Sequence, residues 1–216
     1  MRKTMKIDGF GTVSGGEYGR LEIEGVGKIK GDVNADFLSI NGVVTSNSRI
    51  EGQELLCDGV LNLSASLIVR KIYIDGVINH SQGNIESDFI SCDGVLDSRG
   101  EISTDYLEVH GYISAKEIVG DKVVIYYKPK KYEGSVSNIV NIFTGKKDVK
   151  NYYDVSLIEA TTIEIHGLKV DALNGDDIII GEGCEVKQVE ASSSLKIHPL
   201  ARVGKVTGVK PVSFAG

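Results

Sequence analysis

A glycine that follows an apolar and a polar residue returns along the first half of the chain at an almost constant spacing. Seven such tripeptides end at Gly9, Gly25, Gly42, Gly59, Gly76, Gly94 and Gly111. The steps between these glycines are 16, 17, 17, 17, 18 and 17 residues. So short and regular a period indicates one structural unit stacked on itself, and it constrains the fold more than any other feature.

The residues between these glycines alternate between apolar and polar in short bursts, as in Leu21-Glu22-Ile23-Glu24. Period-two alternation is typical of half-buried strands, and helical repeats are excluded because their periods are about 33 to 47 residues. A unit of about 17 residues that holds two or three short strands is one coil of a parallel β-helix. We therefore predict an all-β fold, a single-stranded parallel β-helix or β-solenoid.

Apolar positions six residues apart predict a triangular cross-section, as at Ile23, Ile29 and Ala35. Glycines such as Gly25 and Gly31 fall where two faces meet, and corners need backbone conformations that glycine adopts without steric cost. The polar residue before each repeated glycine is expected to bond to its own corner backbone. The spacing alone does not specify the handedness of the coil.

The period is interrupted once, after about seven coils, and it returns for three or four more. We predict one solenoid domain in two parts, residues 1–127 and 152–207, separated by an insertion at 128–151. Residues 208–216 would form a tail or a partial cap. At about 4.8 Å per coil, this predicts a rod of roughly 50 Å.

The predicted insertion is basic and amphipathic. Its six lysines exceed its two acidic residues by four charges, so the remainder of this chain of net charge −6 carries −10. The spacing of one helix face is shared by Val136, Ile139, Val140 and Phe143. The lysines expected to take part in the same contact are Lys130, Lys131, Lys146 and Lys147. These residues are candidates for contact with an anionic membrane surface or an acidic protein partner, unless the helix packs against the flank of the solenoid instead.

Composition argues against several classes of protein. The net charge of −6 makes the body of the rod a poor nucleic-acid binder. The sequence has no run of 18 apolar residues and no apolar core of a secretory signal near Met1, so we expect a cytoplasmic protein, at most peripheral at the inner face of the cell membrane. The three cysteines fall in or beside apolar bursts, which predicts buried, reduced thiols.

Stacking at this period places one polar column beside the repeated glycines. Its members are Asp8, Glu24, Asn41, Asp58, Asp75, Asp93 and His110. Such a column could bind cations or supply the paired carboxylates of a polysaccharide-cleaving enzyme, but turn chemistry explains it more simply. His110 and His166 precede equivalent glycines without the spacing of a metal site. The chain has no phosphate-binding loop, dinucleotide fingerprint or nucleophile elbow, so we expect no enzymatic activity, no cofactor and no metal.

The core pattern runs close to both ends of the solenoid, where a β-helix shows unpaired backbone groups over an apolar interior. At the first end the candidate contact residues are Ile7, Phe10 and Val13. At the other end they are Leu195, Ile197, Val203 and Val206. We expect the ends of neighbouring copies to stack into a homopolymer, the alternative being frayed ends and a monomer.

Three stretches carry a resemblance to a known family: Ile7–Gly11, Gly25–Val33 and Asn174–Val186. Over nearly its whole length the chain resembles the bactofilins, bacterial polymer-forming cytoskeletal proteins, in their longer type with a late insertion. The resemblance implies a right-handed β-helix and nucleotide-free filaments built end to end, which position cell-envelope or motility machinery. The residues leave two alternatives, a monomeric β-solenoid that binds through its insertion and, further away, a carbohydrate enzyme or a hexapeptide-type acyltransferase.

Overall fold

The computed structural model describes residues 2–127 and 154–214. The predicted insertion helix and its candidate contact residues lie outside these ranges. The described residues form a 17-stranded sheet of parallel strands and no helix. The strands are β1 (Lys3–Ile7), β2 (Phe10–Ile23), β3 (Val26–Ile40), β4 (Val43–Ser46), β5 (Ile50–Cys57), β6 (Val60–Leu63), β7 (Leu67–Ile74), β8 (Val77–His80), β9 (Ile85–Cys92), β10 (Val95–Ser98), β11 (Glu101–Val109), β12 (Tyr112–Tyr126), β13 (Val155–His166), β14 (Lys169–Ile180), β15 (Glu185–Ile197), β16 (Arg202–Gly208) and β17 (Val212–Ser213).

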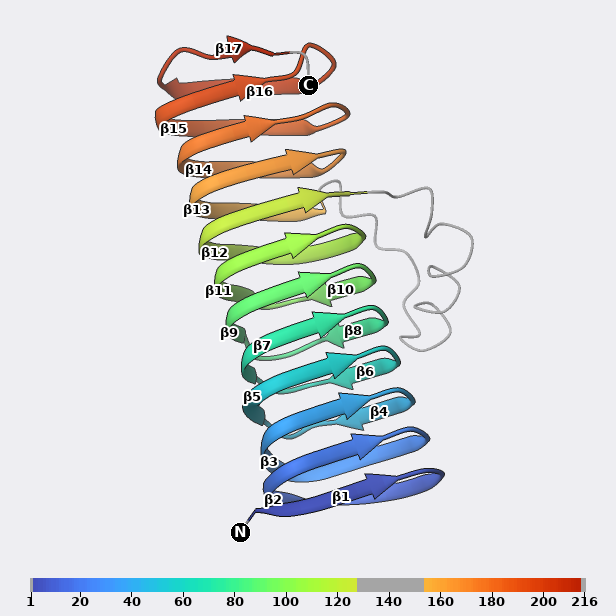
Figure 1. Cartoon of the computed structure of the whole chain (residues 1–216). Helices are drawn as coiled ribbons and strands as arrows, with labels where there is room; N and C mark the ends of the chain where they lie inside the picture. The colour runs from blue at the N-terminus through green and yellow to red at the C-terminus, as the bar shows by residue number, and fades with distance from the viewer. Residues whose placement is uncertain (1, 128–153, 215–216) are drawn as a thin grey trace.

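The strands wind into a β-solenoid of about 11 turns, which confirms the predicted fold. Figure 1 shows a single column of coils with the two chain termini at opposite ends. As the chain climbs, it runs left to right on the near side and right to left on the far side, so the coil is right-handed. The strands on either side of the insertion, β12 and β13, pair directly, and the ladder therefore continues through the interruption.

Each coil has three straight segments, in agreement with the predicted triangular cross-section. β4 pairs with β6 along the first face. β5 pairs with β7 in two separate stretches, and the ladder omits Gln53 and Arg70 between them. This break separates the two paired stretches and forms the corner between them. β5 and β7 thus supply both the second and the third face.

Apolar side chains that point inward form one continuous core along the axis. A representative interior column contains Ile40, Cys57, Ile74 and Cys92, which are paired from coil to coil and fully buried. All three cysteines, including Cys184, are free and buried, as predicted. Burial raises the pKa of Cys57 and Cys92 to about 12 and that of Cys184 to about 11.

One histidine lies inside this core. His80 is 2% exposed, and its Nε2 atom lies 2.9 Å from the carbonyl oxygen of Ala65. A carbonyl only accepts, so Nε2 carries the proton and Nδ1 accepts from the hydroxyl of Ser98 at 2.9 Å. Burial lowers the pKa of His80, because the cation would lose its hydration.

The repeated glycines from Gly25 to Gly94 are required for a reason that differs from the predicted one. Gly25 and Gly42 do not have positive φ angles. Instead, a Cβ atom at Gly25 would lie 2.0 Å from the carbonyl oxygen of Gly9, and one at Gly42 would lie 1.8 Å from that of Gly25. The glycines thus permit close stacking of successive corners. The predicted conformational reason applies at Gly31, whose φ is 99°.

Backbone hydrogen bonds between successive coils hold the repeated corners together. The amides of Asp58 and Gly59 both donate to the carbonyl of Ile40 in the coil beneath, at 3.0 and 2.8 Å. Among the contacts of the described residues, neither Asp58 nor Asp75 bonds to its own corner through its carboxylate. The expectation of side-chain bonding was wrong here, because the neighbouring coil supplies the acceptor that an isolated turn would need.

The C-terminal tail extends the solenoid instead of folding over it as a cap. β17 pairs in parallel with Lys196 and Ile197 of β15, and the amide of Val209 donates to Ala191 at 3.0 Å. β16 and β17 therefore form a last, incomplete coil above β15.

Candidate assembly surfaces

The N-terminal end is an open edge of the parallel ladder. β1 pairs only with the later part of β2, and Phe10–Ser14 pairs only with β3, so their outer edges have no strand partner among the described residues. Of the predicted contact residues, Ile7 and Val13 are buried within the chain, whereas Phe10 is 90% exposed. Phe10 is therefore the side chain that this end offers to another molecule.

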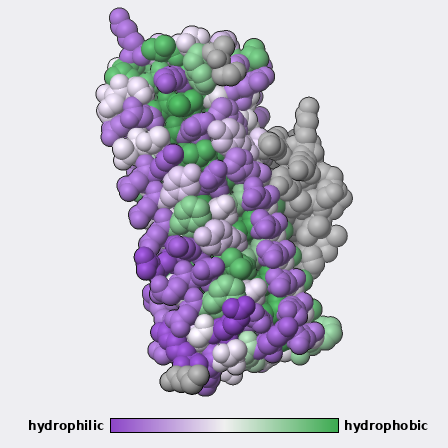
Figure 2. Space-filling model, in the orientation of Figure 1, coloured by the Kyte–Doolittle hydropathy of each residue, from purple (hydrophilic) through white to green (hydrophobic). Residues whose placement is uncertain are grey.

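The C-terminal end is also open, because β16 and β17 pair only with β15. The predicted contact residues divide again: Leu195 is buried, Ile197 and Val203 are half-buried, and Val206 is 37% exposed. Two further side chains are more exposed than these, Leu200 at 64% and Val212 at 62%. Green side chains lie among purple ones at this end, which is uppermost in Figure 2.

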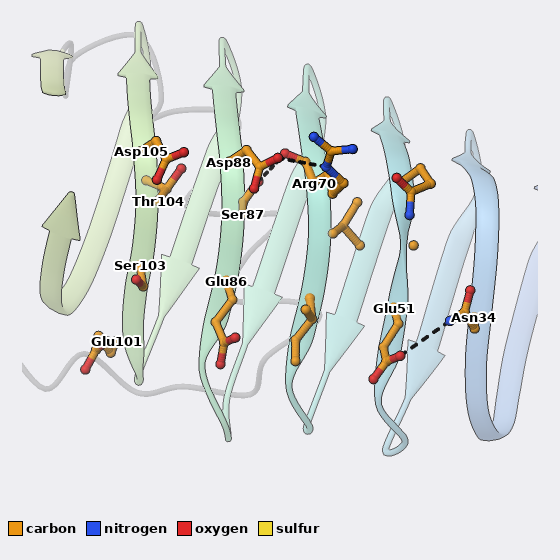
Figure 3. A pocket seen from close by; sticks show the side chains of 14 residues that line it. Asn34, Glu51, Arg70, Glu86, Ser87, Asp88, Glu101, Ser103, Thr104 and Asp105 are labelled. Carbon is orange, nitrogen blue, oxygen red and sulfur yellow. Dashed lines mark hydrogen bonds and ion pairs between the residues drawn. The ribbon is translucent and has the colours of Figure 1, made fainter. Parts of the chain in front are cut away.

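A shallow groove of about 610 Å³ runs along one flank, over the corner between the second and third faces. Its lining is mostly polar, and five of its 14 residues carry carboxylates, among them Glu51, Glu86 and Asp88 (Figure 3). Arg70 lies within it and pairs with Asp88, with 2.8 Å between Nε and Oδ2. The groove is wide and polar, and it lacks the apolar walls that enclose most small-molecule ligands.

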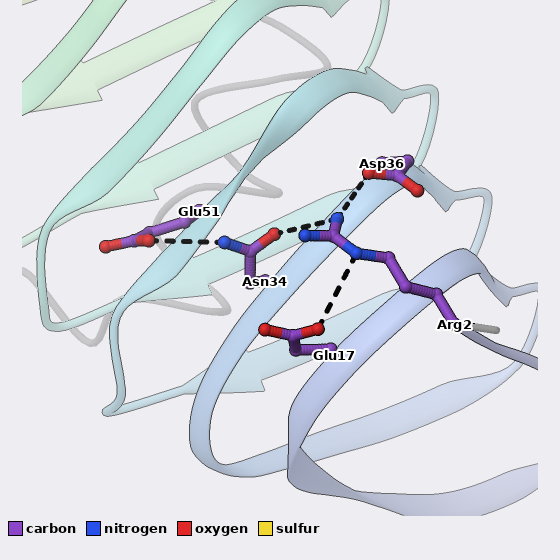
Figure 4. Close-up of polar contacts among 5 residues, drawn as sticks. All are labelled: Arg2, Glu17, Asn34, Asp36 and Glu51. Atoms are coloured by element: carbon purple, nitrogen blue, oxygen red, sulfur yellow. Dashed lines mark hydrogen bonds and ion pairs between the residues drawn. The ribbon is translucent and has the colours of Figure 1, made fainter.

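A polar network lies at the N-terminal end of the same flank (Figure 4). Arg2 pairs with Asp36, lies 3.7 Å from Glu17 and donates to the Asn34 amide oxygen at 3.2 Å. Asn34 in turn donates to Glu51 at 3.4 Å. The network ties the first residues of the chain to successive coils and neutralises the charge of Arg2.

Aromatic rings and carboxylates join the coils on either side of the insertion. The Tyr126 ring is stacked between those of His110 and His166, with centroids 5.0 and 4.6 Å away. Glu164 accepts from the Tyr126 hydroxyl at 2.6 Å and lies 3.1 Å from His166, and Glu108 lies 2.8 Å from His110. The hydrogen bond to Glu164 raises the pKa of Tyr126 to about 12 and lowers that of Glu164. The sequence analysis found that both histidines precede equivalent glycines, but it did not predict that a tyrosine ring lies between them.

A second aromatic ladder contains Tyr73, Phe89 and Tyr106, with centroids 5.6 and 5.4 Å apart. Lys122 lies 5.6 Å from the centroid of Tyr106. The rings pack mainly against one another, so they do not form the open platform on which a sugar stacks. This ladder could have been predicted from the sequence, because the three aromatic residues are 16 and 17 residues apart.

The described ends of the interruption are bonded to each other. The Tyr127 hydroxyl donates to Oδ1 of Asp154 at 3.3 Å, and the amide of Lys169 donates to Oδ2 at 3.1 Å. Burial raises the pKa of Asp154, because the carboxylate loses hydration. These bonds hold the corner at which the chain leaves and re-enters the solenoid.

The polar column beside the repeated glycines lies along one corner of the rod, as the period predicts. Nowhere in residues 2–127 and 154–214 do three or more His, Cys, Asp or Glu side chains gather closely enough to hold a metal ion. In that part of the chain there is also no helix with the length and apolar character needed to cross a bilayer.

None of the protein-family models, curated proteins or solved structures compared with the chain matches it.

Proposed function

We propose that this protein is a non-enzymatic scaffold that assembles end to end. The observation that carries the proposal is that the parallel ladder is open at both ends, with no strand partner for the outer edges of β1, β16 and β17 among the described residues. Open edges pair readily with further strands. An added copy would give these edges the same kind of hydrogen bonds that join the coils within the rod.

Exposed apolar side chains at both ends support this proposal. Phe10 lies at the N-terminal end, and Leu200 and Val212 lie at the C-terminal end, each more than half exposed. Covering them would add hydrophobic stabilisation to the backbone hydrogen bonds. The resemblance to bactofilins agrees with this function. Under it, the protein acts in the cytoplasm without nucleotide or cofactor and positions envelope or motility machinery.

Negative-stain electron microscopy and light scattering of the purified protein, without nucleotide, test the proposal. We expect rods longer than a single solenoid of about 50 Å, with lengths that grow with protein concentration. Phe10→Asp should shorten them, whereas Tyr73→Asp, which changes an exposed aromatic residue on the flank, should not. Uniform single rods at every concentration would refute assembly and favour the monomeric binding module.

A further inference from the structure

The C-terminal tip, residues 198–214, carries positive charge without any carboxylate. It contains Arg202, Lys205 and Lys210 and no Asp or Glu, although the whole chain has a net charge of −6. Arg202 lies 3.5 Å from Glu185 of the coil beneath. Lys205 and Lys210 are exposed, and no ion pair is found for them within the described part of the chain. Two of the three cations therefore face solvent without compensation.

The N-terminal end has as many cations, but most of them are neutralised within the chain. The Lys6 amine lies 3.3 Å from Asp8 and 2.9 Å from Glu24. Hydrogen bonds to Glu24 and Asp8 raise the pKa of Lys6, so its charge and theirs stay paired. Arg2 lies in the carboxylate network of Figure 4. Lys3 alone lacks such a partner among the described residues.

We propose that this difference decides which ends of two rods can join. Two C-terminal tips placed face to face would oppose two uncompensated cations, Lys205 and Lys210, with two, whereas an N-terminal end presents nearly balanced charge. Most joints formed at low ionic strength should therefore include at least one N-terminal end. Two C-terminal tips should join more readily when salt screens their repulsion. This inference rests on the proposed end-to-end assembly.

The expected effect of salt follows from Coulomb's law. Two uncompensated charges opposite two give four repulsive pairs, at separations of about 10 Å across a joint. The Debye length falls from about 30 Å at 0.01 M salt to about 3 Å at 1 M, so most of this repulsion is felt at the lower concentration and almost none at the higher. The association constant of two C-terminal tips should rise on the order of 10-fold between these conditions.

Crosslinking of single-cysteine variants identifies the ends that meet. Thr12→Cys marks the N-terminal end and Ser213→Cys the C-terminal tip, and both positions are exposed. The three native cysteines are buried, so a short bismaleimide reacts at the introduced thiol. At about 0.01 M salt we expect links in Thr12→Cys alone or in a mixture of the two variants, and far fewer in Ser213→Cys alone. At about 1 M salt, links in Ser213→Cys alone should increase on the order of 10-fold.

A charge variant separates screening from a general effect of salt on apolar contacts. In the Ser213→Cys background, Lys205→Gln with Lys210→Gln should produce links at low salt. Lys71→Gln with Lys116→Gln, which removes the same charge from the middle of the rod, should not. Equal linkage of Ser213→Cys at both salt concentrations, or no linkage at either, overturns the inference. If no combination links and the protein scatters light as a monomer throughout, the proposed assembly itself is refuted.

Discussion

Gly42→Ala is expected to destabilise the solenoid strongly, because the added Cβ atom would meet the coil beneath. That atom would lie 1.8 Å from the carbonyl oxygen of Gly25, and ordinary van der Waals contact begins at 3.4 Å. The corner must therefore open by roughly 1.6 Å, the difference between these distances. Neighbouring corners are stacked in the same way, so the rod offers little space into which this one can move.

The cost can be worked out from the bonds at the corner. The carbonyl of Ile23 accepts from the amides of Asn41 and Gly42 at 2.9 and 3.2 Å, and Gly25 accepts from Val43 at 2.9 Å. Opening the corner weakens all three bonds, at about 1 kcal/mol each. Overpacking adds about 1–3 kcal/mol. We therefore expect the free energy of unfolding to fall by about 4 kcal/mol or more.

Urea unfolding followed by circular dichroism measures this loss, and two matched variants isolate its cause. Gly9 has the same place in its tripeptide, but the described residues form no coil beneath it, so a Cβ atom there meets nothing within 4 Å. Gly9→Ala should be neutral or stabilise by up to about 1 kcal/mol. Gly16 has equally open space but a φ of 134°, so Gly16→Ala should cost about 1 kcal/mol through backbone strain alone. A Gly42→Ala variant no less stable than Gly16→Ala would show that close stacking does not explain the repeated glycines.

Three further predictions concern the core and the corner at the interruption. The native cysteines should not react with Ellman's reagent at about pH 8, since burial raises their pKa to about 11 or 12, and rapid reaction before unfolding would contradict this burial. Because burial lowers the pKa of His80, the unfolded state binds a proton below about pH 6.5 that the folded state does not, so stability should fall as the pH decreases. In urea titrations between about pH 7.5 and 5.5, His80→Leu should lessen this loss, and an unchanged slope would exclude His80 as its source. Asp154→Ala should lower the free energy of unfolding by about 1–3 kcal/mol. It should also speed hydrogen exchange at the Lys169 amide, because that amide loses its acceptor. Unchanged exchange at this amide would show that the bond does not hold the corner.

The period alone predicted the coil, its three faces and the continuation of the ladder past the insertion. These features follow from repetition, because residues one period apart must lie in the same column once the coils stack. The role of Gly42 could not be read in the same way. Glycine is required at this position because the carbonyl of Gly25 in another coil lies so close. The spacing of residues in the sequence indicates only that a corner is present. The same holds for Asp58, whose amide finds its acceptor in the coil beneath.

The sequence predicted where the ends of the solenoid lie, but not which side chains are exposed there. The sequence pattern assigned Ile7, Phe10 and Val13 alike to the core. The structure buries Ile7 and Val13, so their side chains are not available as contacts. The assignment of Phe10 was wrong, because its side chain is 90% exposed. The stack of Tyr126 on His166 was also missed, because the insertion places the two residues 40 positions apart and removes the constant spacing.

Repetition also limits where this rod can recognise a particular partner. Coils in its middle present nearly the same backbone, and their edges are already paired by the coils above and below. A partner that reads the backbone would find no unique position there. The period is broken at the two open edges and at the corner between Tyr127 and Asp154. Of these, only the edges present unpaired strands among the described residues, and an unpaired strand is best satisfied by another strand of matching twist. A further copy of the same solenoid supplies such a strand, so the stacking that builds the rod is also the interaction most available at its ends.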